Sequence, residues 1–587
     1  MEEVKQKLEA AILQVYGVKA DVVVTVAPED TGADFASNVA MQLAKLVHKA
    51  PVAIAEELKD AFLADAKASG MAWRVEIAGP GFMNFISPDE YFYGKVADFA
   101  KGQEYLTKGS VWSEYDGKVV VCEFSDPNPF KVLHVGHLYT SMVGDSISRI
   151  LEMAGAKVVR ANFGGDVGLH VAKTMYALLR RPGVYLACLT IEDIARCYVD
   201  GTRAYEEDED DAKAMITELN KIIYAVAELG EEQSQEQSGI EKLTKNFGFS
   251  NRMEQIVKLY WRGRQLSYDY FDNFYARIGV KFDRYYPEST VAVRGLKEVR
   301  QGLDRGVYEE SNGAVVYKGE KFGLHTRVFI NQNGLPTYEA KDVGLIFTKW
   351  DDYHFDESVV ITGNDIVEYM KVVLASVSEM APKLSERTRH LTHGQVKLPG
   401  NEKMSSRKGN FLKAVDVIGM VAQELVESTG QPADEKVVLA ALRYAFLKYK
   451  MGGDIIFNPK ESVAMTGNSG VYLLYSTVRA KKVLQRVGNS ASRSNDTIAS
   501  SETSFVRKLS KKIVQYQDVL KEAVAEKAPN KICAYLFELA QEFSRFYENV
   551  KVIGNENEAE LIVVVQAYTN VMEHGLGLLG IEVPEEM

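Results

Sequence analysis

Apolar and polar positions alternate differently in three parts of the chain, and each pattern predicts a different kind of structure. Up to about residue 105, apolar residues at helical spacing, such as Val4, Leu8 and Ile12, are mixed with a β-branched run at Asp21–Ala27. Between residues 106 and 415, short apolar runs end in polar turns, as the strands of a parallel sheet do. From residue 416 onward the pattern is helical throughout.

These patterns predict a multidomain α/β protein. We expect a small α+β domain at residues 1–105, a Rossmann-type doubly wound parallel-sheet domain at 106–415 and an all-helical bundle at 416–587. A mainly helical insertion is expected around residues 185–275 of the central domain.

The stretch 122–145 carries the clearest chemical signal. Val119–Val121 predicts a buried strand, and the Ser-Asp-Pro-Asn-Pro turn at 125–129 cannot continue it. His134 and His137 follow, with Gly136 between them, at the start of a helical pattern. The unpaired N–H groups at such a helix start bind anions, and the histidines add further donors. We therefore predict a polyphosphate site here.

Further apolar runs end in similar polar turns. Lys157–Phe163 leads into Gly164-Gly165-Asp166-Val167-Gly168, and Val359–Thr362 leads into Gly363-Asn364-Asp365. The strand pattern also returns at Val280–Asp283. Since parallel strands end at one edge of their sheet, these turns predict a nucleotide-binding crevice.

Two further sets of residues suggest what the crevice does. Residues 403–410, Lys-Met-Ser-Ser-Arg-Lys-Gly-Asn, describe a mobile cationic loop that can close on a pyrophosphate, although alone they would be an exposed basic turn. A planar guanidinium could be bound by Glu123, Asn128, Tyr338 and Asp342. Alternatively, Glu123 could be a solvent-facing charge at the end of a strand, and Asp342 could be an acid in the first turn of a helix. No Gly-x-x-x-x-Gly-Lys-Ser/Thr sequence occurs, which disfavours a P-loop enzyme.

Charge and cysteine content limit the kinds of partner and site that we expect. The net charge is −12, yet nine Lys or Arg stand against two acids between Arg479 and Lys512, which marks a local polyanion surface. Four cysteines without a C-x-x-C pair disfavour a zinc ribbon and a disulfide framework. With no apolar run of membrane-spanning length and no basic N-terminal leader, a cytoplasmic location is expected.

Together these motifs resemble those of the class I aminoacyl-tRNA synthetases. His134-Val-Gly-His137 is similar to the HIGH signature, and Lys403-Met-Ser-Ser406, 269 residues later, is similar to the KMSKS loop. The resemblance is strongest to the arginyl-tRNA synthetases. It rests on residues 123–137, 162–168 and 79–84, on the Ala-Leu-Arg-Tyr of a DALR domain at 441–444, and on the ending 575–584.

The resemblance implies that arginine and ATP form arginyl-adenylate, and that arginine then passes to the terminal adenosine of tRNA(Arg). It also implies that activation requires tRNA, that Mg²⁺ accompanies ATP, that no zinc is needed and that the protein is a monomer. The implied catalytic residues are Lys131, His134, His137, Lys403, Ser405 and Lys408. ATP would meet His134, Gly136, His137, Gly165, Asp166, Gly168 and Met404. Arginine would meet Glu123, Ser125, Asn128, Tyr338 and Asp342. The tRNA would meet Phe82, Asn84, Arg479, Lys481, Lys482 and Tyr535.

Two positions depart from the family pattern. Ser406 stands where many class I enzymes have lysine, so Lys131 is expected to supply that charge. The strand end at 363–366 lacks a glutamine that many relatives have nearby. Three alternatives stay open: a class I synthetase for another amino acid, a nucleotidyltransferase that uses no tRNA, and a non-catalytic tRNA-binding paralogue.

Several of these residues also have purely structural interpretations. Gly79-Pro-Gly could be only a structural turn, rather than a support that lets Phe82 and Asn84 touch a base. The aromatic ladder that contains Tyr535 fits a helix core better than a stacking surface.

Overall fold

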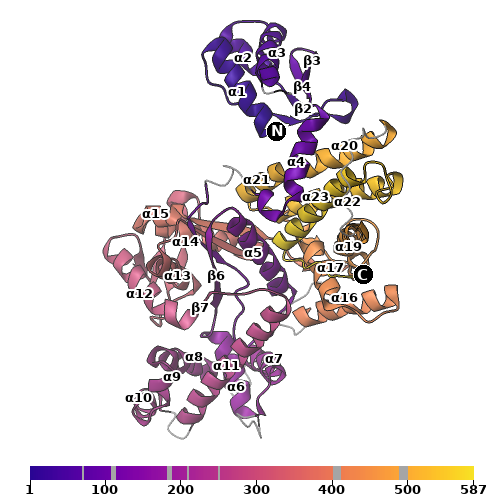
Figure 1. Ribbon diagram of the computed structural model, residues 1–587. Coiled ribbons are helices and arrows are strands. Elements are labelled where there is room, and N and C mark those ends of the chain that lie inside the picture. Colours follow the sequence, from indigo (N-terminus) through magenta and orange to yellow (C-terminus); the bar gives the residue numbers. More distant parts are fainter. Residues whose placement is uncertain are drawn as a thin grey trace.

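Five parallel strands form the sheet around which the central part of the chain folds (Figure 1). The computed structural model describes residues 1–68, 70, 72–107, 114–181, 188–207, 211–248, 252–400, 412–487 and 500–587. The strands lie in the order β12-β11-β5-β6-β7. Their bounds are β5 Val119–Glu123, β6 Lys157–Gly164, β7 Arg284–Pro287, β11 Glu357–Gly363 and β12 Thr388–His393. In chain order this is the 3-2-1-4-5 arrangement of a doubly wound sheet, with its switch point between β5 and β11.

Helices cover both faces of this sheet. Val120 and Cys122 of β5 belong to the core that includes helix α5 (Val135–Met153), whereas Val121 belongs to the core that includes α13 (Tyr338–Tyr353). Alternate residues of one strand therefore meet different layers, which confirms the predicted fold class. Other helices of this layer are α12 Glu288–Asp304, α14 Val367–Met380 and α15 Pro382–Glu386. A small antiparallel sheet precedes α13, built from β8 Glu309–Ser311, β9 Ala314–Tyr317 and β10 Arg327–Ile330.

A helical insertion separates β6 from β7. It lies at the opposite end of the molecule from the N-terminal unit (Figure 1). Its helices are α6 Leu169–Arg180, α7 Ile191–Glu207, α8 Ala212–Leu229, α9 Glu231–Gln235, α10 Gln237–Phe247 and α11 Met253–Arg277. Among the ranges described, no helix combines the length and apolar character needed to cross a membrane.

The N-terminal unit is an antiparallel sheet, in the order β1-β2-β4-β3, covered by helices. Its elements are α1 Glu2–Tyr16, β1 Thr25–Val26, β2 Phe35–Ser37, α2 Val39–Val47, α3 Pro51–Ala68, β3 Arg74–Ala78, β4 Phe82–Ile86 and α4 Asp89–Ala100. Helix α4 packs against the C-terminal helices (Figure 1). At this joint Arg507 donates to Asp34 at 2.8 Å and to Asp89 at 2.6 Å.

The described residues of the C-terminal part form helices and one short strand, β14 (Ile455–Ile456), which pairs with β13 (Val396–Lys397). Its helices are α16 Ala414–Thr429, α17 Glu435–Leu447, α18 Pro459–Ser462, α19 Gly470–Val487, α20 Ser500–Val514, α21 Tyr516–Glu526, α22 Pro529–Asn549 and α23 Glu558–Leu578. It also touches the sheet, because the buried Lys527 lies 3.0 Å from Glu357 of β11.

Three strands differ from their predictions. The strand predicted near Val280–Asp283 lies slightly later in the chain: β7 begins at Arg284, and Val280 enters the core from an irregular segment. The run predicted at 21–27 forms only the two residues of β1. Strand β12 was not predicted, because this edge strand (Thr-Arg-His-Leu-Thr-His) lacks the apolar run of a central one.

Gly580 tests how tightly the C-terminal segment is held. Its φ is +69°, and an added Cβ would lie 2.1 Å from Nη1 of the buried Arg443. We expect Gly580→Ala to lower the free energy of unfolding by about 2 kcal/mol or more, because both the backbone conformation and the close contact oppose a side chain. Gly577→Ala is the matched control, since a Cβ there meets nothing within 4 Å. Urea unfolding of both variants measures the difference, and equal stability would contradict this packing.

Candidate active site

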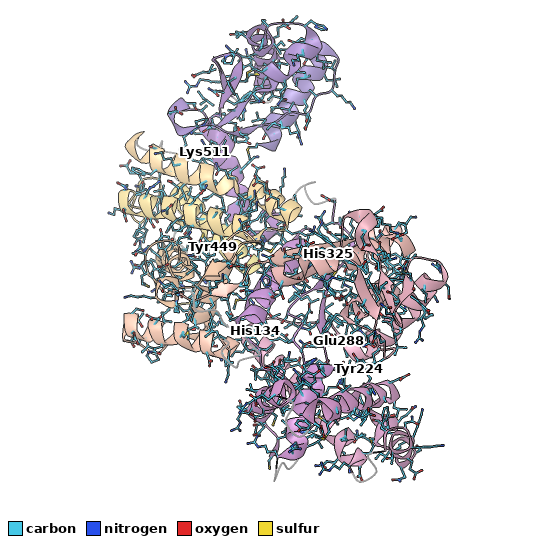
Figure 2. The ribbon with its side chains drawn as sticks, turned by 180° about the vertical axis from the view of Figure 1, so that it is seen from behind. His134, Tyr224, Glu288, His325, Tyr449 and Lys511 are labelled. Atoms are coloured by element: carbon cyan, nitrogen blue, oxygen red, sulfur yellow. The ribbon has the colours of Figure 1, made fainter. Side chains whose placement is uncertain are left out.

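The carboxyl ends of the five strands bring polar residues together at one edge of the sheet. Strands β5 and β12 end in Glu123 and His393, and β6, β7 and β11 end just before Gly165, Glu288 and Asn364. Figure 2 shows His134, Glu288 and Tyr224 near the junction between this edge and the helical insertion. The predicted crevice edge therefore gathers groups from segments that are far apart in sequence.

The turn after β5 is strained and firmly held. Ser125, Asp126 and Phe130 adopt positive φ values of 75°, 48° and 64°. Such conformations persist in non-glycine residues only when the surroundings fix them, and they cluster at functional sites. Three hydrogen bonds from neighbouring segments fix this turn: Phe163 N to Asp126 Oδ1 (2.8 Å), Gly165 N to Asn128 Oδ1 (3.1 Å), and Ser125 Oγ with Tyr275 OH (2.8 Å).

His134 and His137 cap the first turn of α5. Nδ1 of His134 accepts from Gly136 N at 3.0 Å, and Nδ1 of His137 accepts from His134 N at 3.2 Å. Their rings stack with centroids 3.8 Å apart. Because Nδ1 accepts in both rings, each neutral imidazole carries its proton on Nε2. Gly136 is required here, since a Cβ would lie 2.8 Å from the His134 ring.

Both histidines are uncharged at neutral pH. Burial, reinforced by the nearby Lys131, lowers the pKa of His134 to about 4. Burial, His134 and Lys131 lower the pKa of His137 well below its ordinary value. The pair can therefore donate hydrogen bonds but supplies no net charge, so positive charge at this helix start comes from Lys131 and the helix dipole. The ammonium of Lys131 also lies 4.7 Å from the ring centre of Tyr198 in α7.

An acidic cluster of Glu123, Asp126 and Asp342 lies beside this anion site. Glu123 is buried, and Lys349 of α13 donates to its Oε2 at 2.5 Å and to Ser358 at 3.0 Å. Asp342 lies two helical turns before Lys349, on the same face of α13. Burial, with repulsion from Glu123 and Glu288, raises the pKa of Asp342 well above its ordinary value.

The carboxyl of Asp126 also has a raised pKa. Burial and the charge of Glu123 raise the pKa of Asp126 well above its ordinary range. Glu123, Asp126 and Asp342 thus share a buried region in which Lys349 is bound to Glu123. A carboxyl that burial makes costly to ionise becomes easier to ionise when a cation binds beside it. The acidic cluster therefore suits a small positively charged group.

The other residues predicted to contact arginine lie around this acidic cluster and differ in their exposure and hydrogen bonding. The buried Ser125 hydroxyl also accepts from Ser141 at 2.9 Å. Asn128 uses its carbonyl oxygen on the β6 turn. Tyr338 opens α13 and is 57% exposed, so it can reach an incoming ligand.

The turn after β6 fixes the insertion to the sheet. Asp166 is fully buried, and its carboxylate accepts from Arg264 of α11 at 2.8 Å and from Ser289 at 2.9 and 2.7 Å. Both carboxylate oxygens thus accept hydrogen bonds, and Asp166 joins α11 and the start of α12 to the turn after β6. Gly165 is needed for close approach, since a Cβ would lie 2.3 Å from Asn128 Oδ1.

Sequence reasoning missed several neighbours of the site. Lys341 and Glu288 form a buried ion pair at 2.6 Å, and the Lys341 ammonium lies 5.5 Å from the ring centre of Tyr224 in the insertion. His170 contacts Gly165 O at 2.7 Å, and His393 contacts Thr140 at 2.6 Å. Glu288 and His393 could have been indicated only by their positions at strand ends, and Lys341 only by its place on the helix of Asp342.

The cationic segment predicted at 403–410, with Lys403, Met404, Ser405 and Lys408, lies outside the described residues. The chain that follows it reaches the histidine turn directly. Val135 N donates to Leu412 O at 2.9 Å, and Ala414 N donates to Leu133 O at 3.0 Å. His134 and Lys413 form the β-bridge between these bonds.

Three family models match three different parts of the chain. The family model "tRNA synthetases class I (R), catalytic domain" matches residues 103–450, "Arginyl tRNA synthetase N terminal domain" matches 2–86, and "DALR anticodon binding domain" matches 473–587. The chain belongs to the arginyl-tRNA synthetase family.

Individual relatives agree over nearly the whole chain. The arginine–tRNA ligase of Clostridium acetobutylicum is 29% identical over 96% of both chains. That of Treponema denticola is 26% identical over 93% of this chain and 91% of its own. The fold resembles that of the Thermus thermophilus arginyl-tRNA synthetase structure, with a TM-score of 0.75, 22% identity and full coverage of both chains. The family consists of ATP-dependent aminoacyl-tRNA ligases.

The residues predicted to contact tRNA in this synthetase differ in accessibility. Phe82 is 43% exposed, but Asn84 is buried. Lys482 is exposed, Lys481 pairs with Glu573 at 3.1 Å, and Arg479 stacks on Tyr475.

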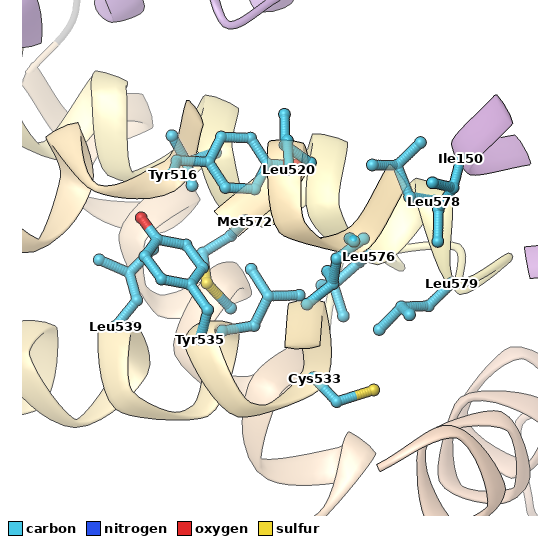
Figure 3. Close-up of a cluster of buried hydrophobic side chains, with 14 of the residues drawn as sticks. Ile150, Tyr516, Leu520, Cys533, Tyr535, Leu539, Met572, Leu576, Leu578 and Leu579 are labelled. Carbon is cyan, nitrogen blue, oxygen red and sulfur yellow. The ribbon is translucent and has the colours of Figure 1, made fainter. Parts of the chain in front are cut away.

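Tyr535 corrects the prediction. Its ring is buried among bundle side chains (Figure 3), and its hydroxyl donates to Lys512 O at 2.9 Å. A base therefore has no access to this ring. The local excess of basic residues is also reduced, because Arg507 and Lys511 pair with Asp34, and Lys512 pairs with Glu538.

The acidic cluster predicts that proton release accompanies the binding of a cation. Since burial and neighbouring carboxyls raise the pKa of Asp342, a cation bound beside it should ionise it and release a proton. Arginine affinity should therefore rise with pH, by at most about tenfold per unit for one proton. Titration calorimetry in two buffers of different ionisation enthalpy measures the released protons.

Asp342→Asn is the control, because the amide has no proton to release at this position. Its arginine affinity should be weaker, by about 2 kcal/mol or more, and less dependent on pH. An affinity that does not change with pH in the unmodified protein, without proton release, would place the guanidinium elsewhere.

Proposed function

We propose that this chain is an arginine–tRNA ligase whose activation of arginine requires tRNA(Arg). The observation that carries the proposal is the acidic cluster of Glu123, Asp126 and Asp342, next to the uncharged histidine pair at the start of α5. A cationic side chain and a polyphosphate can be held side by side there. Tyr338, Ser125 and Asn128 would complete the arginine site.

In the first step, a carboxylate oxygen of arginine attacks the α-phosphorus of ATP and pyrophosphate leaves. The attacking carboxylate is already ionised, so no general base is needed, and the protein positions groups and neutralises charge. His134 and His137 would donate from Nε2 to phosphate oxygens, and Lys131 would add positive charge as it builds up. Lys403, Ser405 and Lys408 would act on the leaving pyrophosphate. Gly136, Gly165, Gly168 and Met404 would border the nucleotide.

In the second step, a hydroxyl of the terminal adenosine of the tRNA attacks the arginyl carbonyl, and AMP leaves. Phe82 of the N-terminal unit and Arg479, Lys481 and Lys482 of the bundle would touch the tRNA. With Asn84 and Tyr535 buried, we propose no direct contact for them. The protein would work as a cytoplasmic monomer.

Mg²⁺ would enter with ATP. Among the residues that the structure describes, no group of three His, Cys, Asp or Glu side chains could hold a metal ion. We therefore propose neither a dedicated magnesium cage nor a zinc site, and assign no step to a protein-bound metal.

Pyrophosphate exchange with each of the 20 amino acids, with and without total tRNA, tests the proposal. We expect exchange with arginine alone, and only when tRNA is present. Exchange with another amino acid would mean a different specificity. Brisk exchange without tRNA would refute tRNA-dependent activation, and no exchange at all would favour a non-catalytic tRNA-binding protein.

Lys131→Ala tests the source of the catalytic charge. We expect arginine-dependent exchange to fall by about 100- to 1,000-fold, because the variant loses a charge that acts on the transition state. Affinity for tRNA, measured by fluorescence anisotropy, should change little.

Lys173→Ala is the matched control. Its ammonium lies 4.5 Å from the ring centre of Tyr205, as Lys131 lies near Tyr198, but it belongs to α6 rather than to the turn that precedes the histidines. We expect near-normal exchange from this variant. Near-normal exchange from Lys131→Ala would show that another group supplies the charge.

A further inference from the structure

One buried arginine joins three separate parts of the molecule. Arg443 of α17 exposes 1% of its side chain, and its partner Asp145 on α5 exposes 2%. Nη1 of Arg443 donates to Asp145 Oδ2 at 2.9 Å and to Leu579 O at 3.1 Å, and Nη2 donates to Ile278 O at 2.8 Å. The guanidinium thus ties the bundle and the C-terminal segment to α5 and to the end of α11.

Helix α5 leads from this joint straight to the active site. Asp145 lies eleven residues from the cap His134, which is about 16 Å along the helix axis. Further contacts hold the same half of α5: Ser146 Oγ donates to Leu578 O at 2.9 Å, and Ile150 lies beside Leu578 in the core (Figure 3). A shift of the bundle therefore has a rigid element through which it can move both histidines.

Helix α11 provides a second connection from the same joint. It ends next to Ile278, which accepts from Arg443, and its side chains hold the turn that precedes the histidines. These contacts are Tyr275 OH with Ser125 Oγ (2.8 Å), Ser267 Oγ with Phe130 N (3.0 Å) and Tyr270 OH with Leu133 N (3.3 Å). Arg443 consequently fixes the spacing of the two helices that hold residues 125–137.

We propose that Arg443 is a positioning residue for adenylate formation, and that it transmits tRNA binding at the C-terminal bundle to the histidine turn. This inference rests on the proposed function. A planar guanidinium bonds a carboxylate and two carbonyl groups at once, in fixed directions, which a lysine ammonium cannot reproduce. The joint can therefore hold two helices at one spacing, and a site misplaced by about 1 Å can lose about 100-fold in rate.

Arg443→Lys is the principal test, because it keeps the positive charge beside Asp145 and removes the fork. At saturating tRNA we expect the turnover of arginine-dependent pyrophosphate exchange to fall by about 10- to 100-fold. The arginine KM and the tRNA Kd should stay within about threefold, since neither binding surface includes Arg443. Asp145→Asn should act in the same direction, and the double variant should lose little more than either single one.

Arg507→Lys is the matched control. It alters another arginine–aspartate joint of the same bundle, but one that leads to the N-terminal unit and away from α5. Its exchange turnover at saturating tRNA should stay close to that of the unmodified protein. Thermal unfolding of each variant, with assays well below the midpoint, separates positioning from loss of fold, and Asp145→Asn carries the test if Arg443→Lys does not fold.

The outcomes are distinct. Normal turnover in Arg443→Lys, a change confined to KM or tRNA Kd, or an equal loss in Arg507→Lys would overturn the inference. Absence of arginine-dependent exchange in the unmodified protein would instead overturn the proposed function, and this inference with it.

Discussion

The active site depends on where helix α5 begins and on what holds its other half. His134 and His137 cap its first turn at the switch point of the sheet, while Asp145 is bound by Arg443 of the C-terminal bundle. A helix is stiff over this length, so catalytic geometry and domain arrangement are set by one element. The chain reaches this helix start through the strained turn at 125–130, and hydrogen bonds from α11 hold that turn in place.

The site separates two kinds of electrostatics within a short distance. Burial keeps the histidines uncharged, so they can act as directional donors, and we propose that Lys131 supplies positive charge for the phosphates. Beside them, the buried carboxyls of Asp126 and Asp342 can bind a cationic ligand, because the charges around them do not offset the effect of burial, which raises the pKa of each. A site of this kind discriminates well, since an amino acid without a guanidinium leaves its buried polar groups unpaired.

The sequence predicted those parts that depend on local patterns. The strand and turn at 119–129, the helix start at His134–His137 and the helix start at Tyr338 are local features, and the structure contains them. Strand β12 was missed because its edge position removes the apolar signal. The ion pairs of Glu123 with Lys349 and of Arg507 with Asp34 join residues more than 200 positions apart, so no spacing rule could reveal them. Counting charges near the C-terminus therefore overstated the free basic surface.

We expect the guanidinium at the end of β5 and the phosphate at the start of α5. A crystal structure with a non-hydrolysable sulfamoyl analogue of arginyl-adenylate measures both positions at once. We predict guanidinium nitrogens within about 2.7–3.2 Å of the Asp342 carboxylate, and the sulfamoyl group beside Nε2 of His134 or His137. A guanidinium bound away from Glu123, Asp126 and Asp342, or an adenylate away from α5, would contradict the account.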